Sequence, residues 1–308
     1  MSVVARTTCP VCRSPRTHRL FVAADPHYGI GGEWQIRACD DCDSRFVENV
    51  PDADALARLY PEDSYYSYHL ATVAPWKRLL RSVVRYTSPP KEPAFRAPGR
   101  VLDFGCGAGE RLLEMRAEGW DVAGVELSAE ARRVAAEQGL DVREKLTGER
   151  GFAPASFDYV RANHALEHVV DPEATLRDLL AVLRPGGTLF LGVPTASGVN
   201  ARLFGPSWWY LTPPLHPVVF STSGLADLVR RVGFDEVRTW TNSDYASVAG
   251  SAQIWLNRGT TRRSNQGVLF AVKPLLLAGH WLAKLQDVLG VGDKLELTAR
   301  RPAMSPDA

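Results

Sequence analysis

Apolar and polar residues alternate along positions 98–303 in a pattern that predicts short buried strands separated by amphipathic helices. Glycine, proline or polar capping residues bound the apolar runs, which is typical of a parallel sheet with crossover helices. The predicted strands are 100–104, 122–126, 157–161, 188–193, 236–241 and 296–300, and the predicted helices are 110–118, 128–139, 171–183 and 223–232. We therefore predict an α/β fold for this part of the chain.

Capping residues mark where two of these helices begin. Ser128 stands at a side-chain cap position, and Gly139 stands where that helix must end. Asp171, Pro172 and Glu173 supply the next helix with a cap, a first-turn proline and a first-turn acid.

Composition divides the 308 residues into three regions. Residues 1–50 are polar and punctuated by cysteine. Residues 51–97 are rich in tyrosine and arginine and end in the breaker cluster Ser88–Pro93. We interpret these two regions as a small module and a linker that could form a helical lid, placed before the main domain at 98–303.

The overall composition is that of a soluble globular protein, with 45% hydrophobic and 23% charged residues. The formal net charge of +1 provides no overall field that would attract nucleic acid or an anionic membrane. No apolar stretch reaches the roughly 18 residues of a transmembrane segment, and the first residues lack a secretory signal pattern. The expected location is the cytoplasm.

The cysteines predict a structural zinc site. Four of the five form two C-x-x-C pairs, Cys9 with Cys12 and Cys39 with Cys42. Each pair presents two thiolates from one tight turn, so the two pairs make a closed tetrahedral set with no open position. The spacing and the odd count fit a reducing compartment better than a disulfide framework. We expect a zinc-ribbon-like module over residues 1–50, with unliganded cysteines as the alternative.

A glycine loop follows the first predicted strand. Gly105, Gly107 and Gly109 allow a ligand to approach the backbone at the carboxyl end of a strand. Glu110 stands where the dinucleotide fingerprint requires its third glycine, and Asp103 precedes the loop. This departure argues against a pyrophosphate site and suits a ligand that carries an amino acid, whose ammonium Asp103 could orient.

Glu126 ends the second predicted strand, 21 residues after Gly105. An acid at this position can accept hydrogen bonds from both hydroxyls of a ribose. The alternative is a generic nucleotide-binding fold in which Glu126 is only a solvated strand end.

Successive motifs of this region resemble those of class I S-adenosylmethionine (SAM)-dependent methyltransferases. The matching segments are Leu102–Gly109, Gly124–Ser128, Ser156–Asp158, His164–His168 and Leu183–Gly187. The resemblance implies a Rossmann-like seven-stranded sheet whose last strand is antiparallel, with a long helical insertion before it. It also implies SAM as cofactor, held by the glycine loop, Asp103, Glu126 and Leu127. Where relatives often show an acidic residue near the adenine amino group, this chain reads Arg143–Gly148, and the adenine contact is left unassigned.

The candidates for chemistry follow the predicted strand at 157–161. In sugar methyltransferases of similar build, the Glu-His pair of this motif is the proposed catalytic element, which implies Glu167 and His168 here, with His168 as a base for a hydroxyl. The alternative is that His168 only packs the following turn. Asn163 and His164 are candidates for contacts with the methionine end of SAM or for a structural role.

A long loop at 195–220 contains Trp208-Trp209-Tyr210 and His216. Loops of this length are commonly lids or binding segments. The tryptophans could form a stacking platform for a sugar or planar ring, or they could anchor the loop to the core. His216 is a second candidate base.

The insertion contains an amphipathic helix at 274–291. Its apolar positions share one face and its polar positions, which are of mixed sign, share another. The face could cover the sheet or form a dimer seam, or it could contact lipid or a lipid-linked acceptor. The apolar positions are Leu275, Ala278, Leu282, Leu285 and Leu289, and the polar positions are Lys273, His280, Lys284 and Asp287.

Three functions are compatible with these features. The order of zinc module, tyrosine-rich segment and methyltransferase domain resembles bacterial methyltransferases that act on sugars, nucleotide sugars, glycans or natural products, which implies O-methylation of such an acceptor. An RNA methyltransferase that uses the zinc module to hold its substrate is the alternative, but the module is not strongly basic. The third hypothesis, a SAM-binding domain without activity, is disfavoured by the intact loop and Glu126.

Overall fold

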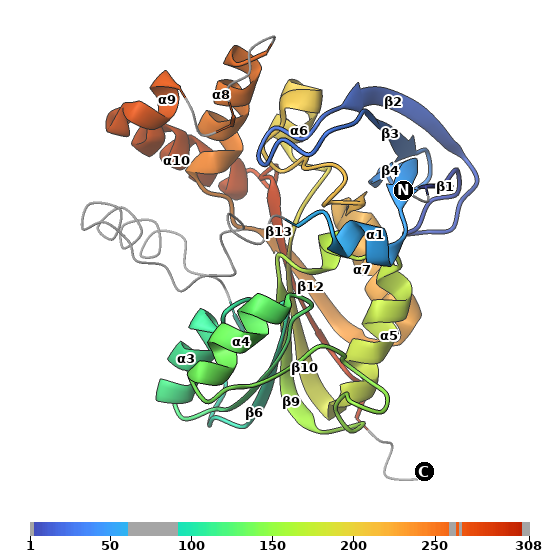
Figure 1. The fold of residues 1–308 in the computed structure, drawn as a ribbon, viewed down its shortest axis with the longest axis vertical. Helices are drawn as coiled ribbons and strands as arrows, with labels where there is room; N and C mark the ends of the chain where they lie inside the picture. The colour runs from blue at the N-terminus through green and yellow to red at the C-terminus, as the bar shows by residue number, and fades with distance from the viewer. Residues whose placement is uncertain (1–2, 61–91, 259–262, 265–266, 304–308) are drawn as a thin grey trace.

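The central sheet of the computed structural model has seven strands (Figure 1). The structure describes residues 3–60, 92–258, 263–264 and 267–303. In spatial order the strands are β12 (Asp235–Thr241), β13 (Lys294–Arg300), β10 (Leu183–Pro194), β9 (Phe157–Asn163), β6 (Arg100–Phe104), β7 (Asp121–Val125) and β8 (Asp141–Arg143). β13 is antiparallel to both of its neighbours, and the other adjacent pairs within β10–β9–β6–β7–β8 are parallel. The predicted sheet is confirmed, and the short edge strand β8 is the one that the apolar pattern did not reveal.

Helices cover both faces of this sheet. α3 (Glu110–Ala117) and α4 (Ala129–Glu137) lie on one face, and α5 (Pro172–Val182) and α7 (Thr222–Val232) lie on the other (Figure 1). The predicted caps are present, since the side chains of Ser128 and Asp171 accept hydrogen bonds from backbone N–H groups in the first turns of α4 and α5. The arrangement is the three-layer one that buries a parallel sheet on both sides.

The N-terminal region forms a small β structure. It consists of β1 (Val3–Ala5), β2 (Thr17–Ala23), β3 (Trp34–Cys39), β4 (Arg45–Val47), β5 (Asn49–Pro51) and the short helix α1 (Ala53–Ala57). Strands β2, β3 and β4 form one sheet with β11 (Val218–Val219), which comes from the loop after β10 and pairs with β4. The N-terminal module and this loop therefore share one sheet.

The module also shares a hydrophobic core with the central sheet. Cys9, Cys39 and Phe46 belong to the same buried cluster as Leu102 of β6. Arg13 of the module pairs with Glu173 of α5 at 2.7 Å. The proposed boundaries at residues 50 and 97 stay predictions, and most of the predicted linker, 61–91, lies outside the described residues.

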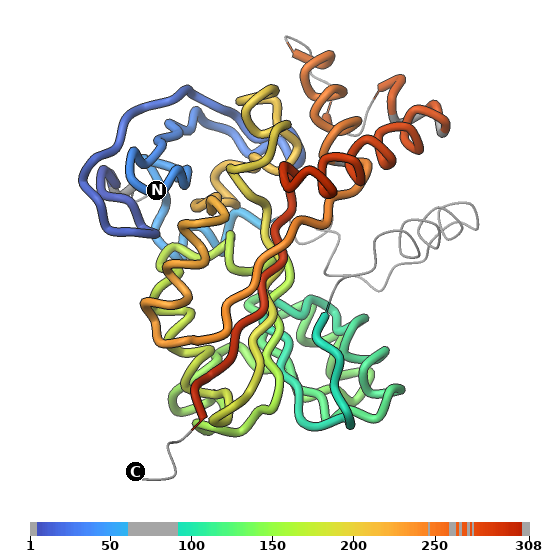
Figure 2. The backbone as a smooth tube through the Cα atoms, turned by 180° about the vertical axis from the view of Figure 1, so that it is seen from behind, coloured from blue at the N-terminus to red at the C-terminus, as the bar shows by residue number. Residues whose placement is uncertain are grey.

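The predicted helical insertion lies between β12 and β13. It contains the π-helical turn η4 (Ala246–Gly250), α8 (Ser251–Leu256), α9 (Val268–Ala271) and α10 (Lys273–Val288). We call residues 246–291 the helical lobe. Figures 1 and 2 show it projecting from one end of the molecule, away from α3 and α4. Within the described residues, no helix is both long and apolar enough to cross a membrane.

Candidate active site

The loop after β6 is shaped for close contact with a ligand. Gly105, Gly107 and Gly109 have φ angles of 76°, 54° and 87°, a backbone region that residues with a Cβ rarely adopt. A Cβ on Gly105 would lie 2.7 Å from the Cβ of Ala165. The loop therefore packs directly against the turn that follows β9, so that the predicted cofactor loop and the predicted catalytic motif are neighbours.

The carboxylate of Glu126 faces the glycine loop. Oε2 accepts a hydrogen bond from the N–H of Gly107 at 3.0 Å, and Oε1 accepts one from the N–H of Ser128 at 2.9 Å. Each oxygen keeps a second lone pair, so the group is held in place and can still accept hydrogen bonds from a ligand. The adjacent Leu127 is 68% exposed, which leaves apolar surface that a flat base would cover. These residues fit the adenosine part of SAM, and their contacts with it stay predictions.

Asp103 and Arg161 form a buried ion pair on neighbouring strands. The two residues are directly opposite in register on β6 and β9, and Arg161 Nη1 donates to Asp103 Oδ2 at 2.6 Å. The predicted contact of Asp103 with the SAM ammonium stays a prediction. Its partner Arg161 was not among the predicted site residues. The sequence signal that could have revealed the pair was a cation inside an apolar strand. A buried charge needs a counter-charge, so a nearby acid was to be expected.

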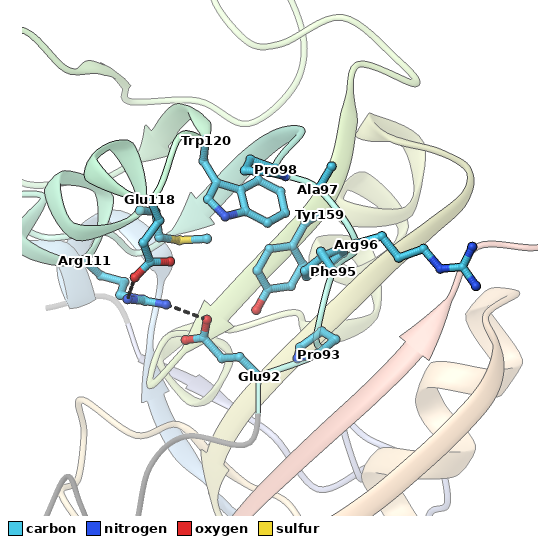
Figure 3. A pocket seen from close by; sticks show the side chains of 11 residues that line it. Glu92, Pro93, Phe95, Arg96, Ala97, Pro98, Arg111, Glu118, Trp120 and Tyr159 are labelled. Atoms are coloured by element: carbon cyan, nitrogen blue, oxygen red, sulfur yellow. Dashed lines mark hydrogen bonds and ion pairs between the residues drawn. The ribbon is translucent and has the colours of Figure 1, made fainter.

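The ion-pair network continues to the wall of a pocket on the side of the sheet that carries α3. Arg161 also pairs with Glu92 at 3.3 Å, and Glu92 pairs with Arg111 of α3 at 3.0 Å. Figure 3 shows Glu92 and Arg111 facing each other beside the rings of Trp120 and Tyr159. None of the residues that line this pocket belongs to the predicted catalytic motif. We therefore place the acceptor site elsewhere.

Four predicted residues come together after β9. Glu167 and His168 lie in the short helix η2 (Leu166–His168), and His216 reaches them from the loop after β10. The rings of His168 and His216 meet edge to face with their centroids 4.6 Å apart. His164 Nδ1 lies 3.1 Å from Oε1 of the fully buried Glu167. We call Glu167, His168 and His216, together with His164, which contacts Glu167, the histidine cluster.

Backbone carbonyls determine the tautomers of the two central histidines. His168 Nδ1 lies 2.8 Å from the carbonyl oxygen of Leu215, and His216 Nδ1 lies 2.8 Å from that of Tyr210. A carbonyl oxygen only accepts, so each Nδ1 carries a proton and each Nε2 bears the lone pair in the neutral ring. The hydroxyl of Tyr60 also lies 2.7 Å from His168 Nδ1. Tyr60 is a further site residue that our sequence analysis did not identify.

Burial and neighbouring charges set the protonation of the cluster. Burial lowers the pKa of His168, and burial together with the nearby His168 lowers the pKa of His216 to about 3. Burial raises the pKa of the Glu167 carboxyl, but the hydrogen bond from His164 and the electrostatic effect of His164, His168 and His216 together outweigh it, and the pKa falls to about 2. At neutral pH the imidazoles of His168 and His216 are therefore neutral and lie beside the Glu167 carboxylate. His216 is the weaker base of the two.

The histidine cluster could accept a proton or hold a cation. One ligand atom from each of Glu167, His168 and His216 lies within 4.8 Å of the other two. Among the described residues, Oε2 of Glu167 is buried without a hydrogen-bond partner. Such an oxygen favours a positive charge nearby, and a protonated His168 would supply it.

Asn163 and His164 have contacts within the protein. The Oδ1 atom of Asn163 occupies the space that a Cβ on Gly192 of β10 would need. His164 has a φ of 55°, and its N–H donates to the carbonyl of Gly192 at 2.7 Å. A histidine in the left-handed region costs conformational energy and is typical of functional turns. The predicted contacts of both residues with SAM stay predictions.

The tryptophans of the long loop are anchors. Trp208 is fully buried, and Trp209 packs against Gly250 and meets His27 edge to face at 4.6 Å. Trp208 therefore cannot act as a stacking platform for a ligand. Tyr65, Tyr66 and His69 of the tyrosine-rich segment could reach the acceptor or could be solvated linker residues, and all three lie outside the described residues.

The four module cysteines converge as two equivalent turns. In each turn the backbone carbonyl of the first cysteine accepts a hydrogen bond from the N–H group four residues later. Arg13 donates to Cys9 at 2.9 Å, and Asp43 donates to Cys39 at 3.0 Å. Sulfur atoms of opposite pairs lie 3.7 Å apart for Cys9 and Cys42, and 3.4 Å apart for Cys12 and Cys39. Tetrahedral Zn²⁺ with Zn–S bonds of about 2.3 Å requires comparable separations. The residues present therefore fit a structural zinc ion.

Comparison with known proteins identifies the fold. The family described as a methyltransferase domain matches residues 72–239, which is more than half of the chain. Haemonchus contortus phosphoethanolamine N-methyltransferase 2, solved in complex with SAM, has a similar fold with a TM-score of 0.50 and 20% identity, over 84% of this chain and 62% of that one. The chain belongs to the class I SAM-dependent methyltransferases.

Curated relatives cover a shorter stretch. Ubiquinone biosynthesis O-methyltransferase from Azoarcus sp. (strain BH72) is 40% identical over 98 residues, which is 30% of this chain and 42% of the relative. The protein of the same name from Xanthomonas axonopodis pv. citri (strain 306) is 37% identical over 115 residues, 35% of this chain and 47% of the relative. The chain thus spans less than half of the length of these two relatives.

Proposed function

We propose that this protein transfers the methyl group of SAM to a hydroxyl group of a small molecule or glycan, with His168 as the base. The single observation that carries the proposal is the histidine cluster, which packs against the predicted SAM loop through Ala165 and Gly105. The two curated relatives named above are O-methyltransferases by name. This supports oxygen as the atom that is methylated.

The residues of the cluster suit proton removal. SAM supplies an electrophilic methyl group on a sulfonium. When the acceptor oxygen bonds to that carbon, the bond from the carbon to the sulfonium sulfur would break and S-adenosylhomocysteine would leave. The proton of the acceptor would move to Nε2 of His168, whose Nδ1–H is held by the carbonyl of Leu215. The resulting imidazolium is stabilised by the buried carboxylate of Glu167. Exclusion of water and alignment by the surrounding loop supply the rest of the catalysis.

A sugar, nucleotide sugar, glycan or natural product is the acceptor class that we favour over RNA. Three basic side chains of the N-terminal module are paired with acids of the same module, Arg19 and Arg37 with Glu48 and Arg16 with Asp41, and Arg13 is paired with Glu173 of α5. A surface neutralised in this way does not track a phosphate backbone. The zinc module is better explained as a structural support for the loop that carries His216, because β4 of the module pairs with β11, which begins two residues after His216.

The test is methyl transfer from radiolabelled SAM into fractionated extract of the source organism. RNA, lipid and small-molecule pools are counted separately, with a Gly105→Arg variant as the inactive control. Label in the small-molecule or lipid pool, absent with the variant, supports the proposal and identifies the fraction to purify. Label in RNA alone would overturn the acceptor class and make the zinc module a substrate reader.

A further inference from the structure

The long helix of the helical lobe packs with its polar face inward. His280 of α10 is buried, Lys284 Nζ lies 3.0 Å from Asn242 Oδ1, and Asp287 Oδ2 accepts from the N–H of Ser243 at 2.7 Å. Lys284 and Asp287 also pair with each other at 2.7 Å. The polar positions His280, Lys284 and Asp287 are therefore turned towards the protein, and α10 does not cover the sheet with its apolar face.

The apolar face of α10 points outward as a consequence. Trp281 is 55% exposed, Leu285 is 54% exposed and Leu289 is 67% exposed. Of the 17 exposed large hydrophobic residues in the described part of the chain, 12 lie between residues 255 and 291. These are Trp255, Leu256, Val268, Val272, Leu275, Leu277, Trp281, Leu282, Leu285, Val288, Leu289 and Val291. Such a concentration of exposed apolar side chains in one lobe is typical of an interaction surface.

The charge of the same segment indicates the partner. Residues 251–291 contain five basic residues and one acidic residue, whereas the chain as a whole is close to neutral. Asp287, the acid, is paired with Lys284. Among the described side chains of the segment, Arg258 and Arg263 supply two further positive charges. Exposed Leu and Trp side chains together with an excess of Lys and Arg are the features of segments that lie at the surface of an anionic bilayer.

We propose that the helical lobe docks on an anionic lipid bilayer, with Trp281 and Leu285 inserted into the headgroup region. A second copy of this chain fits the surface less well. A two-fold symmetric interface places the same patch on both partners, so two segments rich in Lys and Arg would face each other. Anionic lipid headgroups complement both the charge and the apolar area.

The lobe is connected to the histidine cluster through the loop after β10. The Trp209 N–H donates to Ser251 Oγ of α8 at 3.0 Å. The next residue, Tyr210, holds the ring of His216 through its carbonyl oxygen. Docking would thus bring the membrane close to the acceptor site, which suits an acceptor that partitions into lipid. This last step rests on the proposed function, whereas the docking itself does not.

Vesicle co-sedimentation of the full chain tests the docking. We expect binding to vesicles of phosphatidylglycerol and phosphatidylcholine that is at least about tenfold stronger than to phosphatidylcholine alone and that weakens as salt screens the charges. The double variant Trp281→Glu/Leu285→Glu should lose about tenfold or more of this binding. The matched control Leu20→Glu/Val22→Glu, which changes two exposed apolar residues of β2, should bind as the wild type does.

Two further measurements make the outcome decisive. SAM affinity by calorimetry should be unchanged in both double variants, which shows that they fold and separates a failure of docking from a failure of the proposed activity. Light scattering after size exclusion reports the oligomeric state. Equal vesicle binding by wild type and the Trp281/Leu285 variant would overturn the proposal. So would a wild-type dimer that this variant converts to a monomer.

Discussion

His168 and Leu215 are joined by a hydrogen bond of 2.8 Å from Nδ1 to the backbone carbonyl oxygen, which ties the turn after β9 to the loop after β10. The contact sets the tautomer of the ring and leaves Nε2 as the proton acceptor. Leu215 is fully buried, and the next residue is His216. A single backbone group therefore orients the candidate base and positions the second histidine.

Substitution of His168 tests its role as base. We expect His168→Ala to lower kcat by about 10²- to 10⁴-fold, the usual range for loss of a general base. SAM affinity should change little, because the ring is assigned to the acceptor. The control is His18→Ala, which removes an exposed histidine paired with Asp40 in the module. An unchanged kcat in the His168 variant would contradict the base and leave the methyltransferase assignment intact.

The pH dependence of kcat/KM should reflect the low pKa of His168. Burial lowers this pKa, so the neutral, base-competent ring persists as the pH falls below about 6.5, the ordinary value for histidine. The acid limb of the profile is therefore expected below pH 6.5. Glu167→Gln removes a carboxylate that raises the pKa of His168, so its acid limb should move to still lower pH. An acid limb that persists in His168→Ala would assign the titration to another group.

Glu126→Ala should weaken SAM binding. The substitution removes a charged acceptor for the ribose hydroxyls and releases the N–H of Gly107, which Glu126 holds at 3.0 Å. Hydrogen bonds to charged groups contribute about 1.5–3 kcal/mol each, which corresponds to a dissociation constant raised by roughly 10- to 100-fold. Calorimetric titration with SAM measures this dissociation constant. Glu137→Ala, at an exposed position on the adjacent helix α4, is the control and should bind SAM as the wild type does.

Arg161→Ala should destabilise the fold strongly. It leaves the Asp103 carboxylate buried without its partner at 2.6 Å, and such a change costs about 3–5 kcal/mol of unfolding free energy. The double substitution Asp103→Leu/Arg161→Met removes both charges, so it should lower the free energy of unfolding by less than Arg161→Ala does. Urea unfolding followed by circular dichroism provides the comparison. Equal losses in the two variants would show that the ion pair is not the origin of the effect.

Metal analysis of the purified protein should find about one zinc ion per chain, as four thiolates in a closed set imply. Cys39→Ser should abolish this zinc and lower the melting temperature, because Cys39 lies in the core shared by the module and the central sheet. Cys106→Ser in the glycine loop should retain the zinc. A wild-type protein without zinc, purified in the absence of chelators, would contradict the structural site.

The strand and helix pattern made most of the central fold predictable. Strand β6 coincides with the predicted range, and Ser128 and Asp171 cap their helices as expected. These features are local, since they depend on apolar runs and on side chains that reach backbone groups within one turn. Strand β8 was missed because three residues at a sheet edge carry too little apolar signal.

The sequence by itself determined the fold class, the glycine loop, the cysteine set and the Glu-His motif, because each is written in the types and spacing of residues close together in the chain. Only the tertiary structure decided that Arg161 neutralises Asp103, that His216 meets His168, and that α10 turns its apolar face outward. These relationships join segments that are 48 or more residues apart, or depend on which helix face finds polar partners such as Asn242. Periodicity defines the two faces of a helix, but the neighbouring elements determine which of them is buried.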